Sequence, residues 1–344
     1  MTSALAKLSL SVVIPVHNGG ENFRQCLASL AAAVPSPSEI IVVADGDTDG
    51  SWLVAEGFWA QVLRNSTCRG PAQARNLGAR TARGDIVFFV DADVTIPADA
   101  VSQVVAAFAQ EPELAAVFGS YDDEPGATNF LSQYKNLLHH YVHQTAREEA
   151  STFWGACGAI RREVFLALGG FDEQYRRPAI EDIELGARLR QAGQKIRLCK
   201  TLQVKHLKRW GVGSLLKADF FYRALPWTDL VLQAGSLPND LNLRLASRVS
   251  VVLIYGLLGV VTTGAWWWPS SLGVAGILVL ILLALNAPLY SFFWRRRGLW
   301  FTMQTVPWHW FYYFYSGLAF AIGVVRFLIR GRRSSRKAVG ILGE

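Results

Sequence analysis

Two long apolar stretches limit most strongly what this 344-residue chain can fold into. Val249 to Trp268 and Leu272 to Phe293 each offer about the 20 apolar residues that a helix needs to cross a lipid bilayer. A third stretch, Val306 to Ile329, is long enough but contains polar residues such as Arg326. The hydrophobic share of 51% agrees with a lipid-facing part. The sequence therefore predicts a membrane region of two to three helices over residues 241–330.

The charges are divided unevenly along the chain. Residues 241–344 hold 11 Lys and Arg against one Glu, a net charge of +10, whereas residues 1–240 hold 23 against 26 Asp and Glu, a net charge of −3. Basic residues beside apolar stretches are typical of the cytoplasmic side of a membrane, and Arg295 to Arg297 follow two predicted crossings. The third stretch either crosses as well, or lies in the interface so that the basic tail, residues 331–344, stays in the cytoplasm. Because the rest of the chain is slightly acidic, we expect no nucleic-acid partner.

The cysteines and the first residues indicate a cytoplasmic location for the part before the membrane region. No CxxC pair occurs, so neither a zinc site nor a disulfide framework is predicted. Met1 to Lys7 lack the pattern of a secretory signal. We therefore expect a multi-pass protein of the cell membrane whose remaining domain is cytoplasmic. The four cysteines, expected to be reduced, are Cys26, Cys68, Cys157 and Cys199.

Residues 8–119 alternate short β-branched runs with helical segments such as residues 71–82. The runs are LSVVIPV, EIIVVAD, AQVLR, DIVFFVDAD and LAAVFGS. This alternation predicts an α/β fold with a mostly parallel, Rossmann-like sheet that helices cover on both faces. Carboxylates follow two of the runs, at Asp45 and at Asp91 and Asp93. Because ligands of such sheets collect at the carboxyl ends of the strands, we expect a site at this edge.

Two further segments precede the membrane region. Residues 120–150 predict a polar helix, and we expect its His139, His140 and His143 on a solvated face. Residues 214–240 interleave aromatic and charged side chains, as an amphipathic helix at a membrane interface does. The alternative is an ordinary amphipathic helix on the soluble domain.

The pair Asp91 and Asp93 stands directly after a fully apolar run. Two carboxylates at this spacing can hold a hard cation such as Mg²⁺ or Mn²⁺ that bridges a diphosphate. Taken alone, the pattern is as typical of a turn or of a helix cap. Its neighbours along the chain decide between these alternatives.

Several motifs in order resemble family 2 of the inverting glycosyltransferases, over about residues 8–211. They are VVIPVHNGG, ADGDTDGS, GPAQARNLGARTARGDIVFFVDAD, TFWGACGAIRREVFLALGGFDE, the pair Glu181 and Asp182, and HLKRW, which resembles the family's QxxRW motif. The resemblance implies a GT-A fold and a metal-dependent, hexosyltransferase-type enzyme that uses a nucleotide-sugar. It implies Asp93 as the main ligand of Mg²⁺ or Mn²⁺, with Asp91 as a second ligand or near the ribose.

The resemblance also implies the residues that bind the donor. Asp45 would hydrogen-bond the nucleotide base, usually uracil, with Pro15 and Asn18 lining the same pocket. Arg75 would lie near the base or the phosphates. The family often has paired Asp where this chain has Ala44 and Asp45, which leaves the identity of the base open.

The resemblance places the catalytic groups in the second half of the domain. Asp182 would act as general base on an acceptor hydroxyl, with Glu181 supporting it. Acids also suit a helix start for electrostatic reasons alone. Arg209 would stabilise the departing nucleoside diphosphate and Trp210 would stack on a sugar, with His206 in place of the motif's Gln. A basic cluster near a membrane is the alternative for this motif.

These inferences predict transfer of a sugar from a UDP-linked donor to a hydroxyl of a membrane-associated lipid or glycolipid, on the cytoplasmic face. One alternative is transfer to a polyprenyl phosphate, which is already ionised and needs no base. An alternative of another class is a catalytically silent membrane scaffold with the same fold. The predicted parts are a catalytic domain over 1–213 with a nucleotide-sugar half (1–119) and an acceptor half (120–213), an interfacial segment (214–240), transmembrane helices (241–330) and a cytoplasmic tail (331–344).

Overall fold

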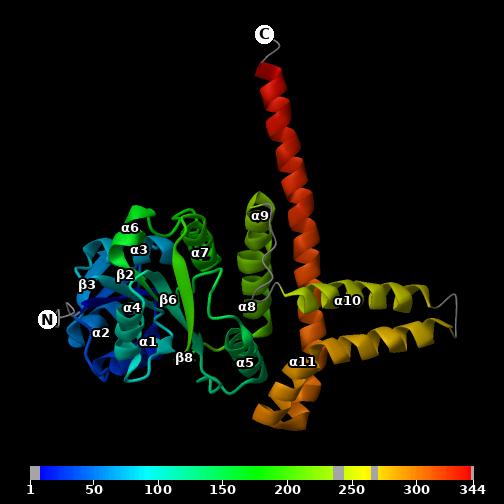
Figure 1. Cartoon of the computed structure of the whole chain (residues 1–344), viewed down its shortest axis with the longest axis horizontal. Coiled ribbons are helices and arrows are strands. Elements are labelled where there is room, and N and C mark those ends of the chain that lie inside the picture. The colour runs from blue at the N-terminus through cyan, green and yellow to red at the C-terminus, as the bar shows by residue number, and fades with distance from the viewer. Residues whose placement is uncertain (1–7, 235–243, 265–269, 342–344) are drawn as a thin grey trace. The chain divides into compact units, whose positions relative to one another are not determined.

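The computed structural model describes residues 8–234, 244–264 and 270–341, which form two compact units separated after Gly211 (Figure 1). The predicted domain boundary at residue 213 lies two residues further on. The end of the predicted interfacial segment, residues 235–240, and the end of the first predicted crossing, residues 265–268, lie outside the described residues.

The first unit is an α/β domain. Its strands are β1 (Leu10–Val16), β2 (Glu39–Asp45), β3 (Gln61–Asn65), β4 (Ile86–Val90), β5 (Val94–Thr95), β6 (Leu114–Tyr121), β7 (Cys157–Arg161) and β8 (Lys195–His206). Its helices are α1 (Gly20–Ala31), α2 (Ser51–Gly57), α3 (Pro71–Thr81), α4 (Ala100–Gln110), α5 (Phe130–Thr145), α6 (Arg162–Ala167) and α7 (Glu181–Gln191).

The described strands form one sheet in the order β3-β2-β1-β4-β7-β6-β8-β5. Four neighbouring pairs are parallel, β1 with β2, β1 with β4, β2 with β3 and β6 with β8. The mostly parallel sheet predicted from the sequence is therefore confirmed for the nucleotide half. The sheet as a whole is mixed, because β7 enters antiparallel between β4 and β6.

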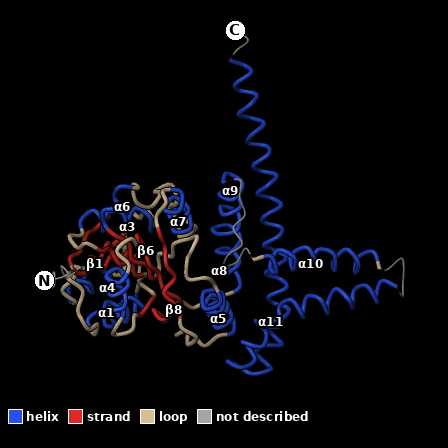
Figure 2. Tube along the Cα trace, in the orientation of Figure 1, coloured by secondary structure: helices blue, strands red, loops and turns tan. Residues whose placement is uncertain are grey.

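Helices cover both faces of this sheet, which Figure 2 shows as a layer of strands between helices. On one face, Val12 and Ile14 of β1 belong to a core that α1 and α4 complete. On the other face, the ring of Phe89 in β4 lies 5.3 Å from that of Phe165 in α6. Alternate residues of one strand thus enter opposite cores, which explains why β4 is continuously apolar and β1 is apolar except at Ser11.

The second unit consists of helices among the described residues. They are α8 (Val212–Lys217), the π-helix η1 (Ala218–Ala224), α9 (Leu225–Ala234), α10 (Leu245–Thr263) and α11 (Ser270–Ile341). The predicted amphipathic segment is thus helical as far as it is described. A left-handed φ of 82° at Gly298, directly after Arg295 to Arg297, interrupts α11 and allows it to double back.

Helices α10 and α11 form an antiparallel hairpin. Ser250, near the start of α10, bonds Asn286 at 3.1 Å, whereas Gly264, after its end, lies beside Ser271. This pairing places Arg244 and Arg295 to Arg297 at the same end of the hairpin. After Gly298 the chain returns along α11, and Tyr313 donates a hydrogen bond to Asn286 at 2.8 Å.

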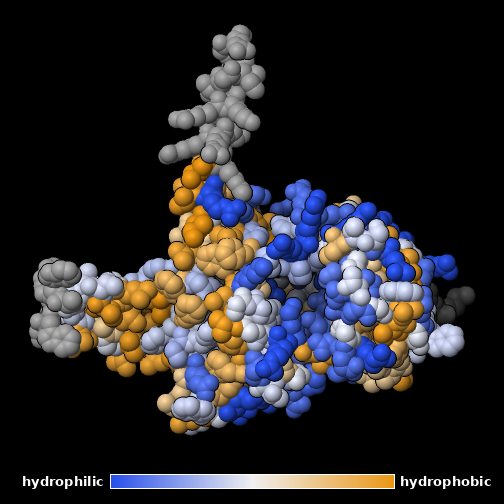
Figure 3. Space-filling model, turned by 180° about the vertical axis from the view of Figure 1, so that it is seen from behind, coloured by the Kyte–Doolittle hydropathy of each residue, from blue (hydrophilic) through white to orange (hydrophobic). Residues whose placement is uncertain are grey.

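Two helices are long and apolar enough to cross a membrane by length and composition. They are Leu245–Thr263 and Ser271–Ile329. Only 11% and 17% of their most apolar windows are buried, whereas the core helix of a soluble protein is mostly buried. Figure 3 shows hydrophobic side chains gathered over the second unit, and the exposed ones on α10 include Val252 and Val261. An apolar surface of this extent suits contact with lipid.

Candidate functional site

The predicted carboxylates lie at the carboxyl ends of their strands, as expected. Asp45 ends β2, and Asp91 follows β4, where its N–H donates to Ala156 just before β7. Leu207, after β8, donates its N–H to the carbonyl of Asp93. Strands of both halves of the sheet therefore converge at this edge, because β7 begins and β8 ends where β4 ends.

Arg75 of α3 joins two of the predicted acidic sites. Its guanidinium bonds Asp91 at 2.6 Å and Glu181 at 2.9 Å, although these acids are 90 residues apart in the chain. Arg75 and Glu181 are each only 4% exposed. Burial lowers the pKa of Arg75, but Asp91 and Glu181 outweigh this effect and raise it above the ordinary value. The guanidinium is therefore a permanent cation that holds the two carboxylates together.

Asp182 lies beside this ion-pair cluster, in the first turn of α7. Its Oδ2 accepts the N–H of Gly155 at 3.1 Å. The loop that carries Gly155 approaches α7 closely at Gly186, where a Cβ would collide with the backbone of Phe153. Asp182 also acts electrostatically on Arg75. The structure thus brings the proposed base to the same edge as Asp91.

Asp93 faces the end of β8. Its Oδ2 lies 3.7 Å from Nε2 of His206 and 4.0 Å from Nζ of Lys208. Burial raises the pKa of Asp93, but His206 and Lys208 outweigh it and hold the pKa at about 2. Asp93 is therefore ionised at neutral pH, as a metal ligand has to be.

Burial, joined by repulsion from Asp93, raises the pKa of Asp91, and Arg75 opposes this shift. The ion pair with Arg75 occupies Oδ1 of Asp91. Asp91 and Asp93 thus have different partners, one a buried guanidinium and the other a histidine. This difference favours Asp93 as the main metal ligand of the pair.

Asp45, at the end of β2, lies in a second part of this sheet edge. Its carboxylate accepts hydrogen bonds from the backbone N–H of Arg69 and Gly70 and from the side chain of Asn65, at 2.7 to 3.0 Å. Only 3% of the residue is exposed. In this structure Asp45 orders the loop that begins α3, the helix that carries Arg75. Its predicted contact with a nucleotide base stays a prediction.

The other predicted donor residues lie around the same loops. Pro15 is half-buried within β1, opposite Val43 of β2. Asn18 is exposed, has a positive φ of 53°, and accepts the N–H of Thr48 at 2.7 Å. Asn18 therefore ties the loop after β1 to the loop after β2.

Arg209 and Trp210 follow β8 and differ in exposure. Arg209 is exposed, whereas Trp210 is only 7% exposed. The backbone N–H of Trp210 donates to Oγ of Ser132 at 2.7 Å, and Nζ of Lys208 lies 4.6 Å from the centre of the Trp210 ring. Trp210 thus anchors the end of β8 to α5, and its predicted stacking on a sugar stays a prediction.

Sequence reasoning missed an aromatic cluster beside Asp93. The ring of Tyr121 stacks on His206 at 4.3 Å and contacts Trp154 at 4.8 Å and His139 at 4.5 Å. Tyr121 directly follows the predicted strand LAAVFGS, and Trp154 stands in the motif TFWGACGAIRREVFLALGGFDE, which gave it no role. The signal that the sequence offered was His206 itself, an aromatic residue that stands two positions before Lys208 in the HLKRW motif.

The solvated face predicted for the histidines of α5 is wrong for two of them. His140 and His143 are 6% and 5% exposed. Their Nδ1 atoms bond the carbonyls of Tyr121 and Gly119, at 2.7 and 3.2 Å. The pairing of β6 with β8 is irregular between Phe118 and Ser120, so the carbonyl of Gly119 accepts from a side chain instead.

With this geometry in view, comparison with known families is decisive. Residues 11–169 match the family model described as glycosyl transferase family 2. The chain carries a family 2 glycosyltransferase domain. Residues 137–209 match a second model, described as the N-terminal domain of galactosyltransferase. The two models together cover the edge that holds Asp45, Asp91, Asp93 and Asp182.

Relatives of the glycosyltransferase domain are distant. An uncharacterised glycosyltransferase of Escherichia coli (strain K12) is 41% identical over 88 residues, 24% of this chain and 26% of that protein. One of Haemophilus influenzae is 27% identical over 191 residues, 53% and 62% of the two chains. A glucosyl-dolichyl phosphate glucuronosyltransferase of Haloferax volcanii is 25% identical over 216 residues, 58% and 69% of the two chains. The chain thus spans less than two thirds of the length of the first two relatives.

A solved structure confirms the GT-A fold. It is a mannosyltransferase of Pyrobaculum calidifontis in complex with GDP-mannose and Mn²⁺. The two share 19% identity with a TM-score of 0.63, over 92% of this chain and 88% of that one. The likeness extends beyond the glycosyltransferase domain, because the first unit ends at Gly211, well short of 92% of the chain.

Proposed function

We propose that this protein transfers a sugar, with inversion, from a UDP-linked nucleotide-sugar to a hydroxyl of a lipid or glycolipid in the membrane. The junction at Arg75 supports this most directly. One buried guanidinium holds Asp91, on the metal side, and Glu181, the neighbour of the proposed base, at 2.6 and 2.9 Å. This shared contact supports a single site that holds both the metal side and the base.

The residues of the edge fit a divalent cation. Oδ2 of Asp93 and Nε2 of His206 are 3.7 Å apart, beyond hydrogen-bond distance but suitable for two ligands of one ion. An imidazole ligand favours Mn²⁺ over the harder Mg²⁺. Among the described residues no group of three or more His, Cys, Asp or Glu could hold a metal ion. Asp93 and His206 would therefore hold the cation together with the donor's phosphates, whose charge the cation would neutralise.

The remaining steps rest on the chain's own residues. Asp182 takes the proton of the acceptor hydroxyl, and the acceptor oxygen forms its bond to the anomeric carbon from the face opposite the diphosphate. The bond between that carbon and the diphosphate oxygen breaks, and its electron pair stays on the nucleoside diphosphate. Arg209, exposed after β8, stabilises this leaving group.

Two relatives bear on donor and acceptor. The mannosyltransferase of known structure holds GDP-mannose, so a guanine base is the alternative to uracil above Asp45. The Haloferax relative is named for glucosyl-dolichyl phosphate, a sugar on a lipid carrier, which supports a lipid-linked acceptor. Sugars have hydroxyls that need a base, in agreement with Asp182. Polyprenyl phosphate stays the alternative acceptor.

The transfer reaction can be tested by incubating the purified full chain with radiolabelled UDP- and GDP-sugars, Mn²⁺ and a membrane lipid extract. We expect one donor to yield a labelled product that partitions into organic solvent, and the Asp93→Ala variant to yield none. A protein that forms no product and hydrolyses no nucleotide-sugar would instead be a silent scaffold.

Replacing His206 by Ala is expected to raise the Mn²⁺ concentration for half-maximal donor hydrolysis about tenfold or more, because one of two protein ligands is lost. Lys205→Ala is the matched control, since Lys205 on the same strand pairs with Asp122 at 3.2 Å instead. An unchanged Mn²⁺ dependence in His206→Ala, with normal folding, would exclude His206 as a ligand.

We further infer that the α10–α11 hairpin anchors the protein in the cell membrane with the glycosyltransferase domain in the cytoplasm. The 19 residues of α10 span about 28 Å, close to the thickness of a bilayer core. The hairpin brings Arg244 and Arg295 to Arg297 to one end, which the positive-inside rule assigns to the cytoplasm.

Cysteine labelling tests this orientation. Cys68 is exposed in the first unit, and the chain has no cysteine after Cys199. Burial and Asp45 raise the pKa of the Cys68 thiol, so labelling requires mildly alkaline buffer. A membrane-impermeant maleimide is expected to label Cys68 only in permeabilised cells, and Thr263→Cys, at the far end of α10, in intact cells. Labelling of Cys68 in intact cells would show that the glycosyltransferase domain lies outside the cytoplasm.

A further inference from the structure

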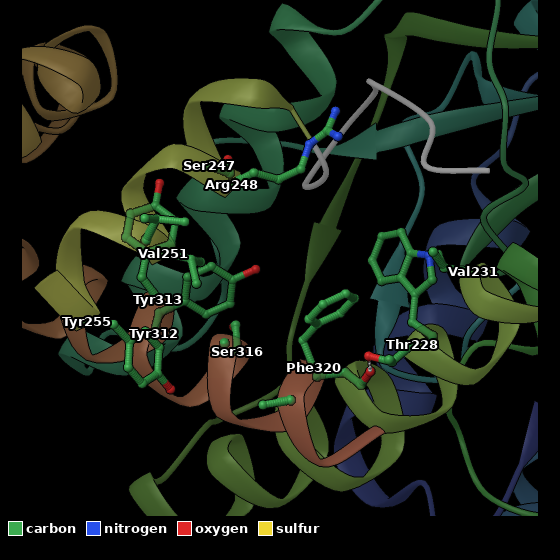
Figure 4. Close-up of a pocket in the computed structure, with 15 residues that line it drawn as sticks. Thr228, Val231, Ser247, Arg248, Val251, Tyr255, Tyr312, Tyr313, Ser316 and Phe320 are labelled. Carbon is green, nitrogen blue, oxygen red and sulfur yellow. Dashed lines mark hydrogen bonds between the residues drawn. The ribbon is translucent and has the colours of Figure 1, made fainter. Parts of the chain in front are cut away.

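The second unit contains a cavity of about 620 Å³ (Figure 4). Its walls come from α9, from the start of α10 and from α11 after Gly298. Gly323 of α11 lies directly against Thr228 of α9, and Tyr255 of α10 donates a hydrogen bond to the carbonyl of Phe314 at 2.8 Å. The three walls are therefore joined by contacts on both sides of the cavity. Its size is that of a site for a small ligand.

The walls of this cavity are apolar although several of their side chains carry hydroxyls. The hydroxyl of Tyr313 donates to Asn286 at 2.8 Å, and that of Thr228 to the carbonyl of Ala224 at 2.8 Å. The hydroxyl of Tyr255 is bound to Phe314, as described above. Because these groups are satisfied within the protein, the cavity is lined by rings and methyl groups. Such a lining suits a hydrocarbon chain.

One cation stands at the head of the cavity. Arg248 is the only charged residue among the described residues that line it. Arg248 lies in the first turn of α10, directly before the apolar stretch that begins at Val249.

The cation and the apolar walls follow one another along α10. Arg248, Val251, Val252 and Tyr255 share one face of the helix, since they are spaced by three, four and seven residues. From Arg248 to Tyr255 the helix rises about 10 Å. In a bilayer this direction leads from the headgroup level into the hydrocarbon. A free anion would not contact the apolar walls, and a neutral lipid would not form an ion pair with Arg248.

We propose that this cavity binds an anionic phospholipid of the bilayer, with its phosphate at Arg248 and one acyl chain among Trp227, Tyr312 and Phe320. The site stands apart from the proposed transfer reaction and requires only that α10 and α11 lie in a membrane. The bilayer's own phospholipids surround these helices, which favours them over a rarer lipid phosphate as the occupant.

Lipid retention tests the site. The full chain is purified in mild detergent, and bound lipid and thermal stability are measured after adding phosphatidylglycerol or phosphatidylcholine with identical chains. We expect about one retained phosphatidylglycerol per protein and a rise in Tm that phosphatidylcholine does not produce. Arg248→Gln is expected to weaken phosphatidylglycerol binding about tenfold or more, and Ala321→Phe, which fills the cavity, to abolish it.

Arg326→Gln is the matched control, because Arg326 is an exposed cation of α11 that does not line the cavity. Arg248→Lys keeps the charge and is expected to keep binding, which guards against misfolding of the Gln variant. Equal binding by Arg248→Gln and wild type, or equal effects of both phospholipids, would overturn the proposal. So would a matching Tm rise with inorganic phosphate, or displacement of the phospholipid by stoichiometric polyprenyl phosphate.

Discussion

Asp182→Asn is expected to lower the rate of sugar transfer about 10²- to 10⁴-fold while the affinity for the nucleotide-sugar stays nearly unchanged. The amide cannot accept the proton of the acceptor hydroxyl. It has the same shape, and its oxygen can still accept the N–H of Gly155, which lies 3.1 Å from Oδ2, although the bond from the N–H of Ile183 to Oδ1 is lost. Initial rates of product formation and titration of the donor separate the two effects.

Glu163→Gln is the control for this substitution. Glu163 is an exposed acid in the first turn of α6, so its replacement by Gln removes the same charge from a helix start. We expect it to transfer at the wild-type rate. Wild-type activity of Asp182→Asn with a polyprenyl phosphate as acceptor would show that no base is needed. This result would contradict the proposed hydroxyl acceptor but not the proposed glycosyltransferase activity.

Arg75→Met is expected to destabilise the first unit by about 3 kcal/mol, because it leaves the buried carboxylate of Glu181 and the partly buried carboxylate of Asp91 without their counter-ion. The variant removes the cation and keeps most of the side-chain length. The free energy of unfolding is measured in denaturant, with a spectroscopic probe in the first unit that reports its unfolding.

Arg64→Met serves as the comparison, since Arg64 is exposed and its guanidinium lies 4.0 Å from the ring centre of Trp52. We expect it to cost about 1 kcal/mol or less. Adding Glu181→Gln to Arg75→Met is expected to recover part of the lost stability, because one uncompensated charge is removed. If Arg75→Met were as stable as wild type but bound the donor weakly, Arg75 would contact the donor, as its position in the motif first indicated.

The nucleotide half could be predicted from the sequence in some detail. The run that became β4 is continuously apolar, and those that became β1, β2 and β6 are mostly so, as a buried strand between two helical layers requires. The acids at their ends follow directly, because parallel strands deliver their carboxyl ends to one edge. The motif order supplied the family, which the family model confirms.

The partners of those acids could not be predicted in the same way. Nothing local in CGAIR shows that β7 enters antiparallel between β4 and β6, yet this insertion brings Gly155 to Asp182. The pairing of Arg75 with both Asp91 and Glu181 joins residues from three separate segments. The partner of buried His143 is the carbonyl of Gly119, which lies at an irregularity between two strands that are distant in sequence.

The sequence by itself determined the class of fold, the residue types at the sheet edge and the presence of apolar helices, because these depend on local periodicity and composition. Only the tertiary structure decided which carboxylate meets a buried cation and which meets a histidine, that α11 doubles back at Gly298, and that a cavity with one cation forms beside α10. These are properties of contacts between distant segments, whose geometry is set by packing and electrostatics that no local pattern records.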